Sequence, residues 1–178
     1  MFSEENAAAG VTFARGFKAA GVKAGIKKSG NLDLAMIYAE KEASVAGVFT
    51  QNAVAAAPVI VSREVVKTGS AHAIVANAGC ANACTGEVGL ANAHKMAALA
   101  AEELGCKADD VLVGSTGIIG VNLPMDKLAA GIKAAAAELS EDGSKNAGNA
   151  IITTDTYSKS CSTEVEIGGK AVRFGAIA

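Results

Sequence analysis

The run from Gly114 to Gly120, with the sequence GSTGIIG, constrains this chain more than any other segment. It follows the short apolar stretch Val111-Leu112-Val113, so a strand is expected to open into a glycine-rich turn. Backbone N–H groups and hydroxyls that converge at such a turn can stabilise an oxyanion or hold a phosphate. The spacing is neither the dinucleotide fingerprint nor a P-loop, because no Gly-Lys-Ser/Thr follows. The pattern therefore predicts either a site for negative charge or a tight turn that needs glycine for its backbone angles.

Two hairpins are expected on the basis of turn residues between apolar runs. The first joins strands over 21–26 and 32–39 through the turn at 27–31, and the second joins 164–167 to 171–175 through Gly168-Gly169. In the second hairpin, alternating apolar residues suit half-buried strands. Further strands are predicted at 45–49, 57–61 and 73–76.

Four helices are predicted from their capping residues and apolar periodicity. Ser62 would cap a short helix over 64–67 that stops at Gly69, and Thr85 would cap a long helix over 87–104 that ends at Gly105. The other two run from Pro124 to Leu139 and over 145–152, and residues 1–16 are expected to be irregular. Mixed helices and strands, with strands often consecutive, predict an α/β fold, an α+β layered domain of mixed sheets with helices packed outside.

Composition restricts the class of partner. The chain has 178 residues, is 51% hydrophobic and carries a formal net charge of −2, so a sizeable core can form in one domain or two small ones. The sequence has no cluster of Lys and Arg, so nucleic acid is not an expected partner. It also has no apolar run long enough to cross a membrane. The start MFSEE lacks the features of a secretory leader, so a cytoplasmic location is expected.

The four cysteines, Cys80, Cys84, Cys106 and Cys161, do not form the spacing of a disulfide framework. Cys80 and Cys84, together with His94, could be considered as metal ligands. Zinc sites, however, usually have two residues between the paired cysteines and a second pair further on. Reduced, small, buried thiols and no metal site are therefore expected.

Hydrolytic chemistry with a Ser–His–Asp set needs a histidine, and only His72 and His94 are present. Neither lies in a glycine-rich loop. Three polar segments, 77–86, 115–120 and 153–156, instead follow predicted strands or a helix and supply hydroxyls, amides and backbone donors. Each could be ordinary turn chemistry. Together they offer a binding site without a convincing nucleophile or base, which is what one half of an active site would contain.

These three segments, NAGCANACTG at 77–86, STGIIG at 115–120 and TTDT at 153–156, closely resemble the ornithine acetyltransferase family. This family comprises the bifunctional glutamate N-acetyltransferase/amino-acid acetyltransferases of arginine biosynthesis. The segments 16–21, 46–50 and 124–127 fit the same family. The resemblance covers essentially the whole chain in order, and its motifs are long and unusual in composition.

The resemblance implies a precursor that cleaves itself before a threonine, and this sequence is similar to the α chain. Residues 1–178 are then expected to form a single α-chain domain that a separate β chain completes. The apolar end at Ala178 falls short of the family's cleavage site, which suggests a strand in mid-domain. An αβ unit assembled further into a dimer of such units, a heterotetramer, is expected.

The resemblance also implies a ping-pong reaction through the β-chain threonine. The acetyl group passes from N2-acetylornithine, or from acetyl-CoA in bifunctional members, to glutamate, and no cofactor is implied. Thr116 and Gly117 match the family's oxyanion hole, and Thr153 matches a substrate-binding position. Two other hypotheses stay open: a self-processed aminopeptidase of similar architecture, and a non-enzymatic module that binds an amino acid or nucleotide at the 114–120 turn.

Overall fold

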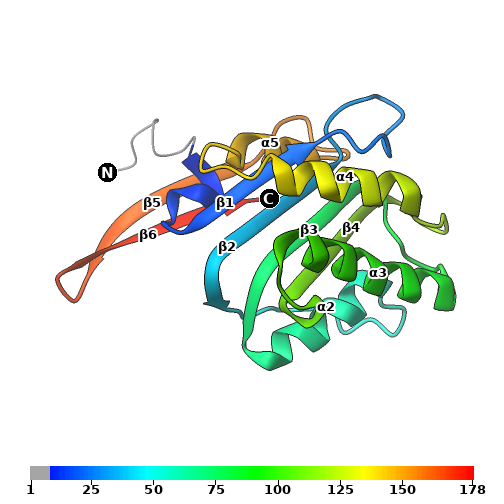
Figure 1. Cartoon of the computed structure of the whole chain (residues 1–178), viewed down its shortest axis with the longest axis horizontal. Helices are drawn as coiled ribbons and strands as arrows, with labels where there is room; N and C mark the ends of the chain where they lie inside the picture. The colour runs from blue at the N-terminus through cyan, green and yellow to red at the C-terminus, as the bar shows by residue number, and fades with distance from the viewer. Residues whose placement is uncertain (1–8) are drawn as a thin grey trace.

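A four-stranded mixed sheet forms the frame of the structure, a computed structural model that describes residues 9–178. Its strands are β1 (Phe17–Val22), β2 (Leu34–Ser44), β3 (Ser70–Cys80) and β4 (Val111–Ile118), side by side in that order (Figure 1). β1 and β2 pair antiparallel, as do β2 and β3, whereas β3 and β4 are parallel. The carboxyl ends of β3 and β4 therefore meet at one edge of the sheet, where polar residues follow both strands.

Helices cover both faces of this sheet because successive strand residues point to opposite sides. Leu34 and Met36 of β2 are buried in the larger core with α2 (Ala57–Thr68), α3 (Gly86–Leu104) and α4 (Met125–Ala137). Ala35, between them, packs instead in a smaller cluster with α5 (Ser144–Ile151). A Cβ on Gly21 of β1 would lie 2.0 Å from the Asn146 carbonyl oxygen, so glycine is what lets α5 approach this closely.

A separate hairpin, β5 (Ser160–Ile167) and β6 (Lys170–Ile177), extends away from the four-stranded sheet (Figure 1). Its two turn residues are Gly168 and Gly169, both with positive φ, as the sequence predicts for a tight hairpin. Its apolar side chains are partly exposed in this chain: Ile167 is 57% and Phe174 49% accessible, whereas Val172 is more buried. The prediction of half-buried strands is therefore confirmed only in part within the chain as described.

Most of the predicted elements are present. The α/β fold class is confirmed, as are the strand containing 73–76 and the helices at 87–104, after Pro124 and at 145–152. The first hairpin is present as an antiparallel pair, but its bounds differ from the prediction: the strands run over 17–22 and 34–44 instead of 21–26 and 32–39, and residues 23–33 join them. Gly105 ends α3 in the left-handed conformation as expected. Thr85 stands at the N-cap position of α3, but its hydroxyl donates to the Asn82 side chain at 2.8 Å rather than capping the helix.

Two strand predictions are wrong. Residues 45–49 have no regular structure, and residues 57–61 begin helix α2 instead of forming a strand. Pro58 sits in the first turn of α2, where its missing N–H costs nothing. Ser62 is accordingly a buried residue inside α2 and not a cap, although Gly69 does end the helix.

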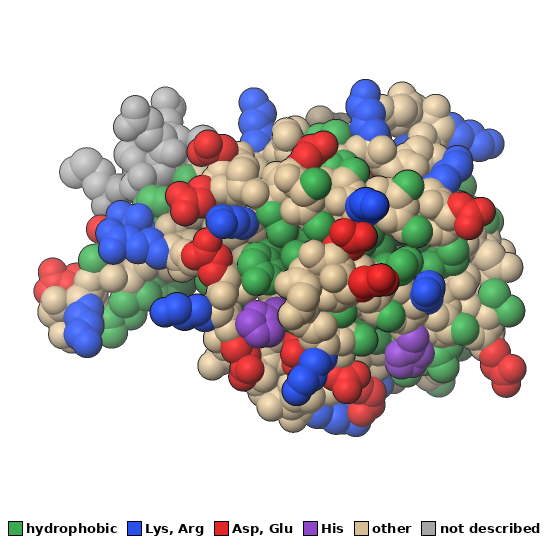
Figure 2. Space-filling view, in the orientation of Figure 1, with side chains coloured by type: hydrophobic (Ala, Val, Ile, Leu, Met, Phe, Trp, Pro, Cys, Tyr) green, Lys and Arg blue, Asp and Glu red, His purple; other side chains and the backbone are tan. Residues whose placement is uncertain are grey.

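Two short 3₁₀ segments complete the chain, η1 (Gly10–Phe13) and η2 (Ala108–Asp110). The segment 1–16 is predicted to be irregular, but η1 lies in its described part, so the prediction is wrong for Gly10–Phe13. The leader argument from MFSEE concerns residues outside the described range. Among residues 9–178, no helix combines the length and apolarity required to cross a membrane. Figure 2 shows acidic and basic side chains interspersed over the visible face rather than gathered into one basic patch.

Candidate active site

A cleft of about 910 Å³ opens where the carboxyl ends of β3 and β4 meet the turn before β2 and the segment after α5. Thr116, Gly117 and Thr153 all line this cleft. The structure thus brings together the three residues singled out as candidate site residues, although Thr153 is remote from the other two in sequence. Lys27 and Lys28 are the charged side chains among the described lining residues, so the electrostatic potential of the cleft favours an anionic group.

Thr116 and Gly117 belong to strand β4, which continues as far as Ile118. The turn predicted over 114–120 therefore begins only at Ile119. Gly117 pairs with Gly79 of β3, and both have positive φ, +128° and +110°. A Cβ on Gly117 would lie 2.5 Å from the Gly79 carbonyl carbon. Glycine at position 117 serves both a close strand approach and an uncommon backbone conformation.

The backbone of β4 also determines what Gly117 can offer to a ligand. Along an extended strand, the N–H groups of alternate residues point to the same edge. The Val113 N–H points away from β3, since it donates to Ser62 of α2 at 2.9 Å, while the Ile118 carbonyl accepts from Ala81 on the β3 side. The same alternation directs the Gly117 N–H toward the outer edge. This N–H and the Thr116 hydroxyl are suitable donors for a developing oxyanion.

A buried hydrogen-bond chain fixes the two strands just before this point. The Ser115 hydroxyl donates to Asn77 Oδ1 at 2.7 Å, and Asn77 Nδ2 donates to the Cys80 carbonyl at 2.9 Å. Asn77 is fully buried. Because a satisfied buried polar network is geometrically demanding, it holds the residue that precedes Thr116 in one register.

The remainder of the predicted polar loop at 77–86 has a structural role. Asn82 is fully buried, with φ of +47°, and its Nδ2 donates to the Gly89 carbonyl at 2.9 Å. Its Oδ1 accepts the Thr85 hydroxyl. These side chains pair with one another and with the start of α3, and neither Asn82 nor Thr85 lines the cleft.

Sequence reasoning missed Asp33, which shapes the opposite wall. Its carboxylate is fully buried and accepts three backbone N–H groups, those of Ala24 and Ile26 at 2.6 Å and Lys27 at 2.8 Å. Hydrogen bonds to an ionised carboxylate are stronger than neutral ones, so this residue fixes the turn before β2. The available signal was an acidic residue directly before a buried strand, next to a Ser-Gly-Asn turn.

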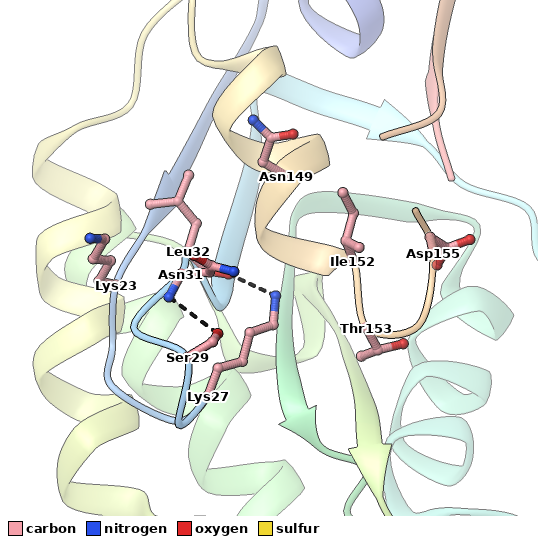
Figure 3. A pocket seen from close by; sticks show the side chains of 9 residues that line it. All are labelled: Lys23, Lys27, Ser29, Asn31, Leu32, Asn149, Ile152, Thr153 and Asp155. Atoms are coloured by element: carbon pink, nitrogen blue, oxygen red, sulfur yellow. Dashed lines mark hydrogen bonds between the residues drawn. The ribbon is translucent and has the colours of Figure 1, made fainter. Parts of the chain in front are cut away.

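Sequence reasoning also missed Lys27, whose side chain lies between the cleft and a smaller neighbouring cavity of about 450 Å³ (Figure 3). Its ammonium donates to the Leu32 carbonyl at 2.8 Å and to the Ala150 carbonyl at 3.2 Å. Burial lowers the pKa of Lys27 below its usual value, and the nearby Asp33 carboxylate opposes that shift. Both cavities share Lys27, Ser29 and Thr153 among their walls.

Thr153 lies in the segment that follows α5, and its side chain is exposed to the cleft. Two residues later, Asp155 accepts a hydrogen bond from Lys159. This contact with the Lys159 ammonium lowers the pKa of Asp155. The ion pair is solvent-exposed and bridges the segment that carries Thr153 toward β5.

The remaining candidate groups lie elsewhere or are structural. Cys80 is buried, with its thiol 3.0 Å from the Val121 carbonyl, and Cys106 is half-buried. Cys84 and Cys161 are exposed, so the prediction of buried thiols is wrong for these two. His72 stacks on Tyr38, and His94 is exposed on α3; neither histidine lines the cleft. Across the described part of the chain, no three His, Cys, Asp or Glu side chains gather as metal ligands would.

Comparisons with known proteins show the family to which the chain belongs. The sequence model of the ArgJ family matches residues 18–178, and the chain belongs to that family. The resemblance to the ornithine acetyltransferase family is thereby confirmed. Among curated relatives, "Arginine biosynthesis bifunctional protein ArgJ" of Symbiobacterium thermophilum is 50% identical, covering 96% of this chain and 43% of the relative. The relative of the same name from Caldanaerobacter subterraneus is 51% identical, covering 89% and 39%. The chain thus spans about two fifths of the length of these relatives.

Solved structures match over nearly the whole chain. The ornithine acetyltransferase of Mycobacterium tuberculosis, complexed with ornithine, is 42% identical with a TM-score of 0.89, over 96% of this chain and 91% of that chain. The arginine biosynthesis bifunctional protein of Bacillus halodurans is 40% identical, also with a TM-score of 0.89, over 95% and 88%. The fold is that of this family.

Proposed function

We propose that this chain is the α part of an acetyltransferase of arginine biosynthesis, which moves the acetyl group of N2-acetylornithine to glutamate. The observation that carries the proposal is the convergence of Thr116, Gly117 and Thr153 on one cleft in a chain of the ArgJ family. Acetyl-CoA is a second candidate donor, used as substrate, and the chemistry needs no resident cofactor.

In the proposed reaction, the nucleophile is the amino-terminal threonine of a β chain cut from the same precursor. Its hydroxyl oxygen attacks the acetyl carbonyl of N2-acetylornithine while its own terminal amine takes the hydroxyl proton. The tetrahedral oxyanion collapses, the bond to the ornithine nitrogen breaks, and that nitrogen leaves with the proton. The α-amine of glutamate then attacks the acetyl ester, giving N-acetylglutamate and the free threonine.

This chain would supply the groups that stabilise and orient these species. The Thr116 hydroxyl and the Gly117 N–H would donate to the oxyanion, and the same pair would assist self-cleavage, which also passes through a tetrahedral species. Thr153 would contact the amino-acid backbone of the ligand. The positive potential from Lys27 and Lys28 would favour the carboxylates that N2-acetylornithine and glutamate share.

The proposed organisation is a single α-chain domain over 1–178 completed by the β chain, with two αβ units forming a heterotetramer in the cytoplasm. The lengths of the relatives support the proposal of a β chain, since this chain spans about two fifths of their length. The hairpin β5–β6, whose apolar residues are exposed here, offers one surface for that part.

The testing experiment uses the protein from its full-length gene. Intact-mass measurement and amino-terminal sequencing should find a second chain that begins with threonine. Incubation with acetyl-labelled N2-acetylornithine and glutamate should yield labelled N-acetylglutamate, and the same assay with labelled acetyl-CoA decides whether that donor is used. An uncut chain, or hydrolysis of short peptides without transfer to glutamate, would contradict the proposal; the second result would indicate the aminopeptidase.

A further inference from the structure

The ammonium of Lys27 connects two segments that are 118 positions apart, the turn before β2 at Leu32 and the end of α5 at Ala150. Figure 3 shows the Lys27 side chain between the turn that carries Ser29 and the end of α5, and Thr153 on the loop that follows α5. An ammonium has three N–H donors, and two of them are used on these backbone carbonyls. The Lys27 side chain therefore holds the backbone at Leu32 and Ala150, and the contact at Ala150 affects the position of the residues that follow it.

The end of α5 needs such a partner. The last four carbonyls of a helix lack intrahelical donors, and the Ala150 carbonyl is one of them because α5 ends at Ile151. A cation at this end also interacts favourably with the helix dipole. The last turn of α5 contains no basic residue of its own, so Lys27 supplies the cation from another segment.

The chain turns away from α5 directly after this contact. Ile152 adopts an extended conformation, with φ of −63° and ψ of 137°, and Thr153 follows it into the cleft. Only three peptide bonds separate the Ala150 carbonyl from the nitrogen of Thr153. The orientation of Thr153 therefore depends on how the end of α5 is held.

The other end of Lys27 is fixed on the opposite half of the site. Its backbone N–H donates to the buried Asp33 carboxylate at 2.8 Å. Its backbone nitrogen and its Cγ each lie 3.3 Å from where a Cβ on Gly79 would stand, so the start of its side chain packs on Gly79. Gly79 is the register partner of Gly117. Lys27 thus spans the distance between the Gly79–Gly117 pair and the segment that carries Thr153.

We propose that Lys27 is a positioning residue that holds Thr153 at a fixed place relative to Thr116 and Gly117. The effect of Lys27 on catalysis rests on the proposed acetyltransferase function. Its effect on the backbone position of Thr153 does not depend on that function. Lys27 acts through the end of α5, and its role is to keep the substrate-binding threonine and the oxyanion donors in register.

The test compares variants of the complete protein. Lys27→Met keeps the length of the side chain but removes the ammonium, and Lys27→Arg keeps a cation that can reach the same carbonyls. Lys133→Met, at an exposed position on α4, is the matched control for loss of a lysine charge. Each variant is made alone, and Lys27→Met is also combined with Thr153→Ala.

The first measurement is amide hydrogen exchange in the last turn of α5, at residues 148–151, whose N–H groups donate within the helix. Lys27→Met should accelerate exchange there about tenfold, because local opening no longer breaks a contact to the ammonium. Lys27→Arg should restore most of the protection, and Lys133→Met should leave it unchanged. Unchanged exchange in Lys27→Met would overturn the proposal whatever the activity of the protein.

The second measurement is the kinetics of acetyl transfer. Lys27→Met should raise KM for N2-acetylornithine about tenfold with kcat changed less than about threefold, since a displaced Thr153 weakens binding. In the Thr153→Ala background, Lys27→Met should add less than about twofold, because both changes remove one interaction. Fully additive effects would show that Lys27 does not act through Thr153. A wild-type protein without transfer activity would contradict the proposed function, and hydrogen exchange would still decide the role of Lys27.

Discussion

The Ser62 hydroxyl of α2 binds both backbone groups of Val113 in β4. It donates to the Val113 carbonyl at 2.7 Å and accepts the Val113 N–H at 2.9 Å. β4 is one of the two outer strands of its sheet, and such a strand presents backbone groups that must find partners or water. The Ser62 side chain therefore satisfies the outward-facing backbone groups of β4 at Val113, three residues before Thr116.

Replacing this hydroxyl should destabilise the fold. Ser62→Ala leaves the N–H and carbonyl of Val113 buried without their partner, and the free energy of unfolding should fall by about 1–3 kcal/mol. Denaturant unfolding of the complete protein measures the change. Ser44→Ala, at an exposed serine at the end of β2, should stay within about 0.5 kcal/mol of wild type. Equal effects of the two substitutions would contradict the role assigned to Ser62.

The close approach of β3 and β4 at the cleft should make Gly117 intolerant of a side chain. In Gly117→Ala, the new Cβ would meet the Gly79 carbonyl carbon at 2.5 Å and the Cys80 nitrogen at 2.7 Å. Gly120→Ala provides the matched control, because Gly120 also has positive φ but nothing lies within 4 Å of its Cβ position. The control should cost about 1–2 kcal/mol from backbone strain alone. Gly117→Ala should cost clearly more, and equal losses in thermal or denaturant unfolding would show that the strands can move apart.

The Asp33 carboxylate should be essential for the turn that carries Lys27. Asp33→Ala leaves the N–H groups of Ala24, Ile26 and Lys27 without their acceptor, so the free energy of unfolding should fall by about 2–4 kcal/mol. Asp142→Ala, at an exposed position, is the control and should have little effect. Hydrogen exchange at residues 24–27 gives a local reading. Protection that survives Asp33→Ala would mean that other contacts hold the turn.

The elements predicted from the sequence are those with local signals. Helix α3 has a full apolar stripe and a glycine at its end, and the β5–β6 turn has two adjacent glycines, so neither needs tertiary context. The apolar run at 57–61 gives no such signal, since a short run suits a strand and a buried helix equally. Residues 57–61 are helical because α2 buries Val61 and Val65 on one face. Residues 45–49 are apolar too, but β2 ends at Ser44.

The sequence predicts those residues of the candidate site that stand in recognisable motifs. Thr116, Gly117 and Thr153 stand in motifs that resemble those of a family, and the structure places them in one cleft. Asp33 and Lys27 could not be found in this way because their partners are backbone groups. The Ala150 carbonyl and the Ala24 N–H look the same in every sequence, and only the folded chain brings them to these side chains.

The Asp155–Lys159 pair predicts a titration at low pH. The hydrogen bond from Lys159, and then its charge, lower the pKa of Asp155 from the ordinary 3.8. A carboxyl whose pKa is lower in the folded state adds stability above its unfolded pKa and loses it as the pH falls through the folded value. The carboxyl carbon of Asp155 should therefore titrate below 3.8 by NMR, and Lys159→Met should bring its midpoint back toward 3.8. Because the pair is exposed, added salt should have the same effect. An unchanged midpoint in Lys159→Met would show that the pair does not form in solution.

Removing the Thr116 hydroxyl should slow acetyl transfer without unfolding the protein. An oxyanion donor acts mainly in the transition state, so Thr116→Ala should lower kcat about a hundredfold and change KM little. The substitution should cost little stability, because Thr116 is only half-buried and its backbone pairing with Ala78 remains. Since the proposed oxyanion donors also assist self-cleavage, the variant is tested as α and β chains produced separately, alongside wild type made in the same way. Thr156→Ala, at an exposed threonine that does not line the cleft, is the control and should keep wild-type turnover. If Thr116→Ala also kept wild-type kcat, the developing charge would have to be stabilised by other donors, and Gly117 alone or groups outside this chain would take that role.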